Sequence, residues 1–174
     1  LIIGGSQGAK IFDSNLKNSL VKISKIVPIK IFHQSNVRNI QNLSNYYSEN
    51  KIENKIFSFE KDFLKIVQQV NLCITRAGAS TLAELSILNI PFIAVPLPSS
   101  KDNHQLENAK FYDNNGCCWV LDQEIFENKI EKILRNIIED KSDYYKKKDN
   151  LKKLNLKNTW LNINQKLLKN LYES

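Results

Sequence analysis

Residues 1–10, LIIGGSQGAK, join a short apolar run to the start of a helical pattern through a turn with glycine at positions 4, 5 and 8. Glycine lets a backbone approach an anion closely, and a helix N-terminus adds free N–H groups and a positive dipole end. This order of strand, glycine turn and helix predicts the first unit of a parallel α/β sheet with an anion site. Many phosphate-bearing ligands would fit such a turn.

The same alternation of short apolar runs and longer amphipathic segments continues along the chain. Further strands are predicted at 29–34, 55–59, 72–75, 92–96 and 117–121, with helices at about 9–25, 37–50, 61–69, 80–88, 105–114 and 123–139. Short strands that alternate with helices predict a Rossmann-like, doubly wound parallel sheet of about six strands. Right-handed crossovers then place all the strand carboxyl ends at one edge, where such folds bind ligands.

The last part of the chain has a different composition, because it is rich in lysine and asparagine and contains no further strand. We expect residues 1–140 to form the sheet domain and residues 141–174 to form helices that pack on it. The alternative is a basic amphipathic helix that binds a membrane surface. No apolar run approaches the ~20 residues of a membrane-spanning helix.

Composition limits the class of function. The 174 residues, 42% of them hydrophobic, fit one compact domain, and the net charge is +7. Part of this charge lies in KKKDNLKK at 146–153. The chain has no arginine-rich stripe and no interleaved arginine and aromatic pattern, so nucleic acid is not expected as a partner. An anionic substrate or an anionic membrane surface explains the sign equally well.

The cysteines and histidines indicate neither a disulfide framework nor a metal centre. Cys73, Cys117 and Cys118 form no C-x-x-C pair, which predicts reduced, buried thiols. The two histidines have no metal-ligand spacing, so we expect no metal and no cofactor. The chain contains no methionine, even at position 1, and begins within a predicted strand. We therefore expect a fragment of a longer protein.

A second anion cradle is predicted after the fourth strand, in TRAGASTLAE at 75–84. Gly78 lies at the turn, and the next helix opens with the N–H groups of Ala79, Ser80 and Thr81. Glu84 follows one turn later, where a carboxylate reaches vicinal hydroxyls. The alternatives are a first-turn acid favoured by the helix dipole for Glu84 and an N-cap role for Ser80 or Thr81.

A polar cluster follows the fifth strand, in NHQLENA at 103–109. Gln105 and Asn108 are three residues apart, so they share a helix face, with His104 beside them. Amides both donate and accept hydrogen bonds, which suits sugar hydroxyls. For His104 alone, a capping or surface role is the alternative. Together with the two cradles and the acid, the cluster predicts a site for a nucleoside diphosphate that carries a sugar.

Two other nucleotide sites are disfavoured by the sequence. The second strand ends in His33-Gln34-Ser35 and supplies no acid for the ribose of NAD, so an NAD oxidoreductase is not favoured. The glycine turn also lacks the G-K-[ST] of a P-loop.

The motifs GGSQGA, TRAGASTLAE and NHQLENA, in this order and spacing, resemble the C-terminal half of the MurG family of bacterial glycosyltransferases. The resemblance extends from residue 1 to about residue 121. Members of that family transfer N-acetylglucosamine from UDP-GlcNAc to lipid I, which makes lipid II for peptidoglycan. The resemblance implies a GT-B architecture, in which the C-terminal of two Rossmann-like domains holds the donor. It also implies an enzyme on the cytoplasmic face of the bacterial inner membrane.

The resemblance implies a role for each matching position. The diphosphate would lie by Gly5, Ser6 and Gln7, and would be bound by Ala79, Ser80 and Thr81. Glu84 would hold the ribose hydroxyls, and the sugar would be read by His104, Gln105 and Asn108. FEKDF at 59–63 stands where the family has F-x-x-D-M, so the Glu60 backbone would meet uracil, and Phe63 replaces the usual methionine with a ring that can stack.

The resemblance also implies what this chain lacks. The general base, the lipid I acceptor site and the membrane-docking surface would belong to an N-terminal domain that is absent here, so the chain alone would be inactive. Two alternatives stay open. One is a separate catalytic subunit of a two-chain UDP-GlcNAc transferase, and the other is a non-catalytic module that binds nucleotide sugars.

Overall fold

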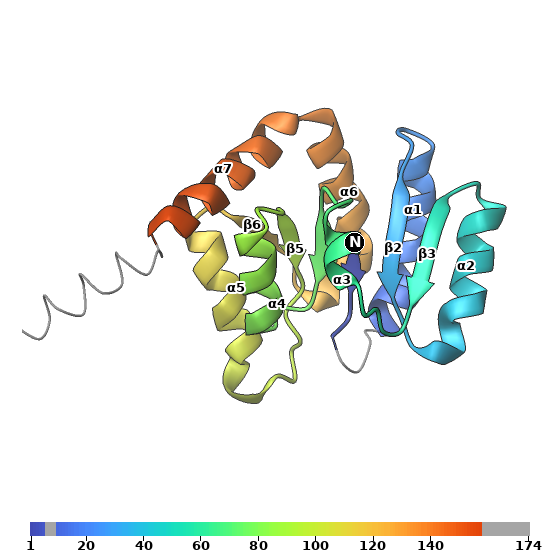
Figure 1. Ribbon diagram of the computed structural model, residues 1–174, viewed down its shortest axis with the longest axis horizontal. Coiled ribbons are helices and arrows are strands. Elements are labelled where there is room, and N and C mark those ends of the chain that lie inside the picture. Colours follow the sequence, from blue (N-terminus) through green and yellow to red (C-terminus); the bar gives the residue numbers. More distant parts are fainter. Residues whose placement is uncertain (6–9, 158–174) are drawn as a thin grey trace, which may run out of the picture.

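A computed structural model describes residues 1–5 and 10–157, with side chains described as far as residue 155. Its centre is a six-stranded sheet in the order β3-β2-β1-β4-β5-β6 (Figure 1). The strands are β1 Ile2–Ile3, β2 Lys30–Gln34, β3 Glu53–Phe57, β4 Cys73–Thr75, β5 Phe92–Ala94 and β6 Cys118–Val120. All five pairings are parallel. The prediction of a doubly wound parallel sheet is therefore confirmed.

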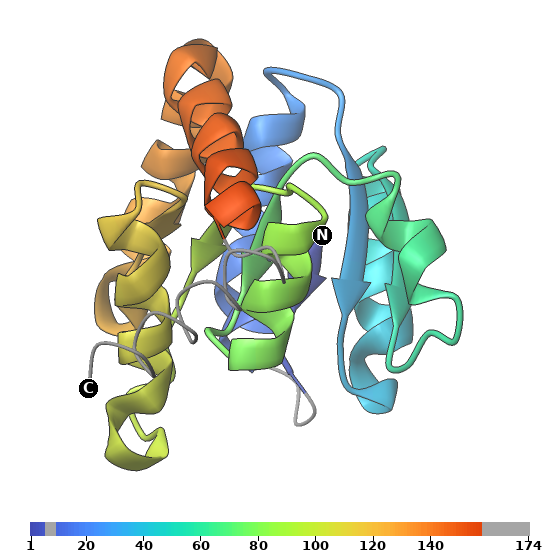
Figure 2. The same cartoon turned by 60° about the vertical axis from the view of Figure 1, so that its left-hand side comes forward.

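Helices follow the strands as the alternation predicts. They are η1 Phe12–Leu16, α1 Lys17–Ser24, η2 Val37–Asn39, α2 Ile40–Glu49, α3 Phe63–Val67, α4 Ala79–Ile87, η3 Lys101–Asn103, α5 His104–Asn114, η4 Gln123–Ile125, α6 Phe126–Glu139 and α7 Lys141–Lys157. Figure 2 shows the helices in two layers on either side of the sheet. The order in which successive strands are added to the sheet reverses between β1 and β4, and ligands of open α/β sheets bind outside the strand ends at such a point.

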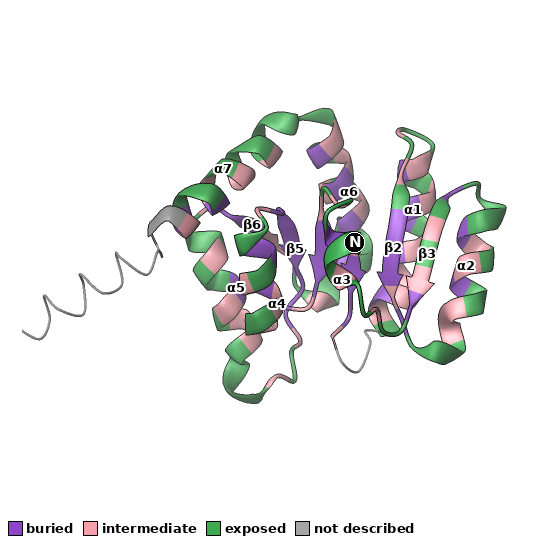
Figure 3. Ribbon diagram, viewed as in Figure 1, coloured by how far each residue is buried: buried purple, intermediate pink, exposed green. Residues whose placement is uncertain are grey.

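Helices cover both faces of the sheet, and neighbouring residues of each strand point to opposite faces, so the inner strands are buried on both sides, whereas the edge strand β3 is buried only in part. Ile2 packs into the cluster beneath α1, α2 and α6, whereas Ile3 packs into the cluster beneath α4, α5 and α7. In Figure 3 the inner strands accordingly form the buried centre of the molecule, whereas β3 is mostly intermediate or exposed, and exposed residues lie on the outer helix surfaces. All three cysteines are free and buried, which confirms the prediction of reduced thiols.

Two local predictions are wrong. The third strand covers Glu53–Phe57 instead of 55–59, because it pairs with β2 residue for residue, from Lys30 opposite Glu53 to Gln34 opposite Phe57. Phe59 therefore lies beyond the strand and is 76% exposed. Helix α4 begins at Ala79 with Gly78 as N-cap and no side-chain capping bond, so neither Ser80 nor Thr81 is the N-cap.

Helix α7 packs against α4 and α6. Leu151 and Leu154 lie in the core cluster, and Asn155 Nδ2 donates to Ser86 O at 2.6 Å. Asn150 Nδ2 donates to Gly116 O at 3.0 Å, which ties α7 to the start of β6. The part of the expected helical tail at 158–174 lies outside the described residues. Among the helices that the structure describes, none is long and apolar enough to cross a membrane.

Candidate functional site

Four of the residues proposed from the sequence meet around one cavity at the carboxyl edge of the sheet. This cavity of about 230 Å³ is lined by Ile3, Gln34, Phe57, Phe59, Glu60, Phe63, Thr81 and Glu84. They come from the ends of β1, β2 and β3, the loop before α3, the first residue of α3, and the first two turns of α4. The structure thus brings together the expected base, phosphate and ribose positions, although they are distant in sequence.

The cavity lining combines apolar and polar residues. Its phenylalanines, together with Ile3, offer a surface for a flat ring, whereas Thr81 and Glu84 offer polar groups to a ligand. Sequence reasoning missed Gln34 as a lining residue, although its position at the end of β2 marks it. Gln34 Nε2 donates to Ser58 O at 3.4 Å, which is a long hydrogen bond.

The loop between β3 and α3 is ordered by the Glu60 carboxylate. Its Oε1 accepts a hydrogen bond from Asp62 N at 3.2 Å, and its Oε2 pairs with Lys55 Nζ. The hydrogen bond from Lys55 lowers the pKa of Glu60, with the Asp62 backbone bond as the next cause. Because the side chain is occupied in the loop itself, the Glu60 backbone is the part suited to contact a ligand.

The start of α4 presents unbonded backbone N–H groups beside the cavity. Leu82 N is the first amide to bond back within the helix, to Gly78 O at 3.0 Å. The N–H groups that precede it have no acceptor within an α-helix, and they belong to Ala79, Ser80 and Thr81. The exposed Glu84 side chain follows on the same helix and reaches the cavity. Backbone donors and a carboxylate are thus offered from the same helix end.

Arg76 ties together the loops that follow β4, β5 and β6, and sequence reasoning missed it. Its Nη1 donates to Val95 O at 3.1 Å and Pro96 O at 3.3 Å, and its Nη2 donates to Gln123 Oε1 at 2.6 Å. The guanidinium also lies 5.4 Å from the centre of the Phe12 ring. Burial lowers the pKa of Arg76. The feature of the sequence that could have identified Arg76 is its position directly after β4, within TRAGASTLAE at 75–84.

The amide cluster of α5 lies outside this cavity and is held by the protein's own backbone. Gln105 Oε1 accepts from Leu97 N at 3.0 Å, and Asn108 Nδ2 donates to Ala77 O at 3.0 Å. His104 is exposed, and its Nδ1 lies 2.6 Å from Lys101 O, so Nδ1 carries the proton. Asn108 therefore braces the loop before α4. These two bonds do not use the Gln105 NH₂ group or the Asn108 side-chain oxygen.

The glycine turn is described only at its first residues. Gly5 has a φ of +80°, a left-handed conformation that favours glycine, and a Cβ there would meet nothing within 4 Å. Ser6 and Gln7, both proposed at the diphosphate, lie outside the described residues. The described part of the turn follows β1 directly at the carboxyl edge.

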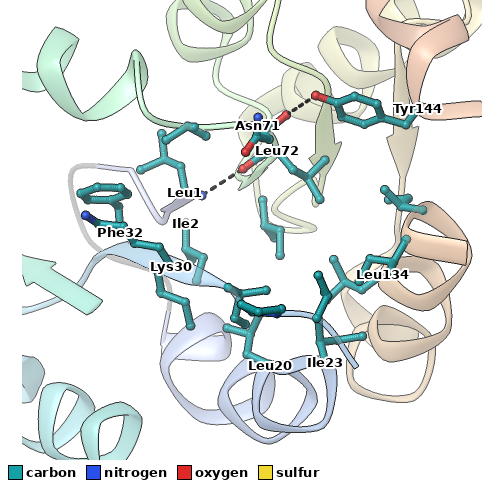
Figure 4. Close-up of a pocket in the computed structure, with 18 of the residues that line it drawn as sticks. Leu1, Ile2, Leu20, Ile23, Lys30, Phe32, Asn71, Leu72, Leu134 and Tyr144 are labelled. Carbon is teal, nitrogen blue, oxygen red and sulfur yellow. Dashed lines mark hydrogen bonds between the residues drawn. The ribbon is translucent and has the colours of Figure 1, made fainter. Parts of the chain in front are cut away.

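A larger cavity of about 470 Å³ lies at the opposite, amino-terminal edge of the sheet (Figure 4). Its lining is mostly aliphatic, with Leu20, Ile23 and Leu134 on the helix side. The hydrogen bonds there are internal: the Leu1 ammonium donates to Leu72 O, and Tyr144 Oη donates to Asn71 O. It contains none of the predicted site residues, so it is not the candidate site. Within the described ranges, no cluster of histidine, cysteine and acidic residues suited to a metal ion is found.

Comparison with known proteins gives a consistent result. A family model described as the glycosyltransferase family 28 C-terminal domain matches residues 1–160. A UDP-N-acetylglucosamine–N-acetylmuramyl-(pentapeptide) pyrophosphoryl-undecaprenol N-acetylglucosamine transferase of Pelagibacter ubique is 48% identical over 97% of this chain and 48% of its own length. The enzyme of the same name from Rickettsia bellii is 34% identical over 79% of this chain and 39% of its own. The chain thus spans about half the length of these relatives, or less.

Two solved structures share the fold. The crystal structure of MurG from Acinetobacter baumannii matches 87% of this chain and 46% of its own, with a TM-score of 0.76 and 27% identity. The solution structure of ALG13 matches 78% of this chain and 83% of its own, with a TM-score of 0.53 and 17% identity. The second likeness is one of fold alone.

Proposed function

The chain belongs to the family of glycosyltransferase family 28 C-terminal domains, and from this premise we propose that it is the donor-binding domain of an N-acetylglucosaminyltransferase. The donor is UDP-GlcNAc, and the whole enzyme transfers its sugar to lipid I to make lipid II. The observation that carries the proposal is the meeting of Glu60, Phe63, Thr81 and Glu84 around one cavity, next to the free N–H groups of α4.

The nucleoside fits the cavity in one orientation. The uracil ring lies against the phenylalanine side, where Phe63 stacks on it and the Glu60 backbone meets its polar edge. The Glu84 carboxylate then accepts hydrogen bonds from the ribose hydroxyls. This order brings the diphosphate over the N–H groups at the start of α4. Gly5 is proposed as a further contact, as are Ser6 and Gln7, which lie outside the described residues.

The sugar extends from the diphosphate towards α5. Gln105 and Asn108 are already fixed to the loops after β5 and β4, so their remaining amide groups are preorganised for sugar hydroxyls. Exposed His104 lies at the helix start beside them. Amide side chains alone do not identify the substituent at the second carbon of the sugar. Competition between UDP-GlcNAc and other donors for the chain tests which sugar it prefers.

The reaction chemistry supported by this chain is stabilisation of the leaving group. UDP gains negative charge as the glycosidic bond breaks, and the fixed N–H groups at the helix ends stabilise that charge. The base that accepts the proton of the lipid I hydroxyl belongs to an N-terminal domain, as does the contact with the cytoplasmic membrane surface. Residues 1–140 form the donor domain in this account, and of the expected helical tail at 141–174 the described part, α7, packs on it.

The alternative of a separate subunit in a two-chain transferase is weaker. Its structural support is the likeness to ALG13, which concerns the fold alone. A non-catalytic module that binds nucleotide sugars would use the same binding groups as the donor domain of a transferase. The two differ in whether sugar is transferred, and this is measured after the chain is joined to an acceptor domain.

The first test is calorimetric titration of the chain with UDP-GlcNAc, UDP-glucose and GDP-mannose. UDP-GlcNAc is expected to bind best, and Glu84→Ala is expected to abolish its binding. Glu49→Ala, an exposed acid on the distant α2, is the matched control and should bind normally. A folded chain, shown by a cooperative thermal melt, that binds no uridine nucleotide would contradict the proposal.

A further inference from the structure

Gln34 is a neutral polar side chain among the phenylalanines that line the candidate donor cavity. It is the last residue of β2, opposite Phe57 of β3, and it lines the cavity together with Phe57, Phe59 and Phe63. None of the contacts with the donor proposed above uses it. A methionine would line the same cavity without burying polar atoms, so the amide needs an explanation.

The hydrogen bonds of the Gln34 amide are incomplete within the described part of the chain. Its Oε1 is buried there without a hydrogen-bond partner. Its Nε2 donates to Ser58 O at 3.4 Å, beyond the usual range for an N–H···O bond. An unpaired buried carbonyl oxygen destabilises the folded state. The amide thus adds little to the fold, and a residue that breaks the rules of stability in this way is typical of a functional site.

The Ser58 carbonyl determines how the amide is oriented. A carbonyl oxygen only accepts hydrogen bonds, so the NH₂ group of Gln34, not its Oε1, belongs next to Ser58 O. Ser58 lies in the loop between β3 and α3, and the residues on either side of it, Phe57 and Phe59, both line the cavity. An NH₂ group has two N–H donors, so the second one is available to a ligand.

Uracil needs a donor besides the Glu60 backbone. Its polar edge presents two carbonyl acceptors with one N–H donor between them, whereas the Glu60 backbone has one N–H and one C=O. The other lining residues do not supply the missing donor to the base. Ile3 and the phenylalanines have no polar group, the Glu84 carboxylate only accepts, and Thr81 lies at the proposed phosphate position. The Gln34 NH₂ group is the donor that remains for the second carbonyl.

We propose that Gln34 is a base-recognition residue of the donor site, whose side-chain NH₂ group donates a hydrogen bond to a ring carbonyl of uracil. The proposal rests on the donor function proposed above and adds to it a side chain that reads the base itself. Two consequences follow. Every ligand that carries the uracil ring uses the contact, with or without a diphosphate. Removal of the amide weakens binding but does not weaken the fold.

The test measures the affinities of the chain for uridine and UDP by NMR titration, and its free energy of unfolding in urea. Gln34→Met keeps the length of the side chain and removes both polar atoms. We expect the affinities for uridine and UDP to fall by the same factor of about 5, the scale of one neutral hydrogen bond, with stability unchanged or higher. Gln41→Met removes an exposed amide on α2 that bonds to Asn45, and this matched control should change neither affinity.

Thio analogues of uridine identify the carbonyl that accepts the bond. Sulfur is a weaker acceptor than oxygen, so one of 2-thiouridine and 4-thiouridine should bind the wild-type chain and Gln34→Met with nearly equal affinity. The other analogue should keep the difference of about 5-fold between the two chains. Gln34→Asn keeps the amide but shortens its reach, and it takes the place of Gln34→Met if that variant does not fold.

Each outcome supports or overturns the proposal. An equal loss for uridine and UDP that one thio analogue removes supports it. Unchanged affinity, a loss for UDP alone, or an equal loss that neither analogue removes overturns it, and the donor function stands because the wild-type chain still binds UDP. If the folded wild-type chain does not bind UDP, the donor function fails and this inference fails with it.

Discussion

Arg76 and Gln123, 47 residues apart in the chain, are joined by a 2.6 Å hydrogen bond between Nη2 and Oε1. Through this bond and its contacts with Val95 O and Pro96 O, one guanidinium connects the carboxyl ends of β4, β5 and β6. The three loops that surround the proposed diphosphate and sugar positions therefore share one brace.

Loss of this brace should destabilise the chain. Arg76→Met leaves the Val95 and Pro96 carbonyls without their donor, so we expect the free energy of unfolding to fall by about 2 kcal/mol, the scale for hydrogen bonds to a charged group. Urea denaturation measures the free energy of unfolding, and Arg38→Met, a substitution of an exposed arginine, is the control. Equal stability of the two variants would show that the brace contributes nothing.

The Asp13 carboxylate predicts a pH dependence. Burial raises its pKa, but the close contact with His33 and the hydrogen bonds from Asn39 and Ser35 outweigh this, so the pKa of Asp13 lies below its ordinary value. A group with a lowered folded-state pKa stabilises the protein above its unfolded pKa of about 3.9 and loses that contribution as the pH falls through the folded value. The stability difference between wild type and Asp13→Asn should thus be larger at pH 7 than at pH 3. Urea unfolding at both values checks this, and a constant difference would refute it.

Phe63 is expected to contribute to the binding of the base. Phe63→Ala should weaken uridine binding about 5- to 10-fold, given the energies measured for a base stacked on an aromatic ring. Phe63→Met keeps an extended apolar side chain and should lose less. Leu64→Ala, at the neighbouring position that is 64% exposed, is the control. Titration with uridine decides the order, and full affinity in Phe63→Ala would place the base elsewhere.

Helix α7 depends on a small apolar contact. Leu151 is fully buried between α7 and the cluster beneath α4 and α5, so Leu151→Ala should lower the free energy of unfolding by about 2–4 kcal/mol through lost contacts and a cavity. The measurement is thermal or urea unfolding of the 174-residue chain. A change below that of an exposed substitution such as Leu64→Ala would mean that α7 does not stabilise the domain.

The parallel sheet was predictable because each strand carries its own signal in an apolar run that ends in a turn. The carboxyl-edge placement of Glu60, Phe63, Thr81 and Glu84 followed from topology and the resemblance. The ends of the strands were harder to predict from the sequence. Strand β3 ends at Phe57 because its partner β2 ends at Gln34, and neither segment alone indicates that pairing.

Long-range side-chain contacts could not be predicted at all. The meeting of Asp13 with His33 requires the crossover between β1 and β2 to be known. The meeting of Arg76 with Gln123 requires the order of β4, β5 and β6 in the sheet to be known. Gln105 and Asn108 were expected to face the sugar alone, yet each also bonds to the backbone. Sequence spacing identified their shared helix face but not the loops that they brace.

The most direct test of the central claim is a ¹⁵N-resolved NMR titration of the chain with UDP. The account predicts that backbone amide signals shift at 60, 63 and 79–84, with smaller shifts at 105 and 108 when UDP-GlcNAc replaces UDP. Signals from the apolar cavity at the amino-terminal edge, such as Leu20 and Leu134, should stay unchanged. Shifts confined to that cavity, or no shifts from a folded chain, would contradict the assignment of this domain to the nucleotide-sugar donor.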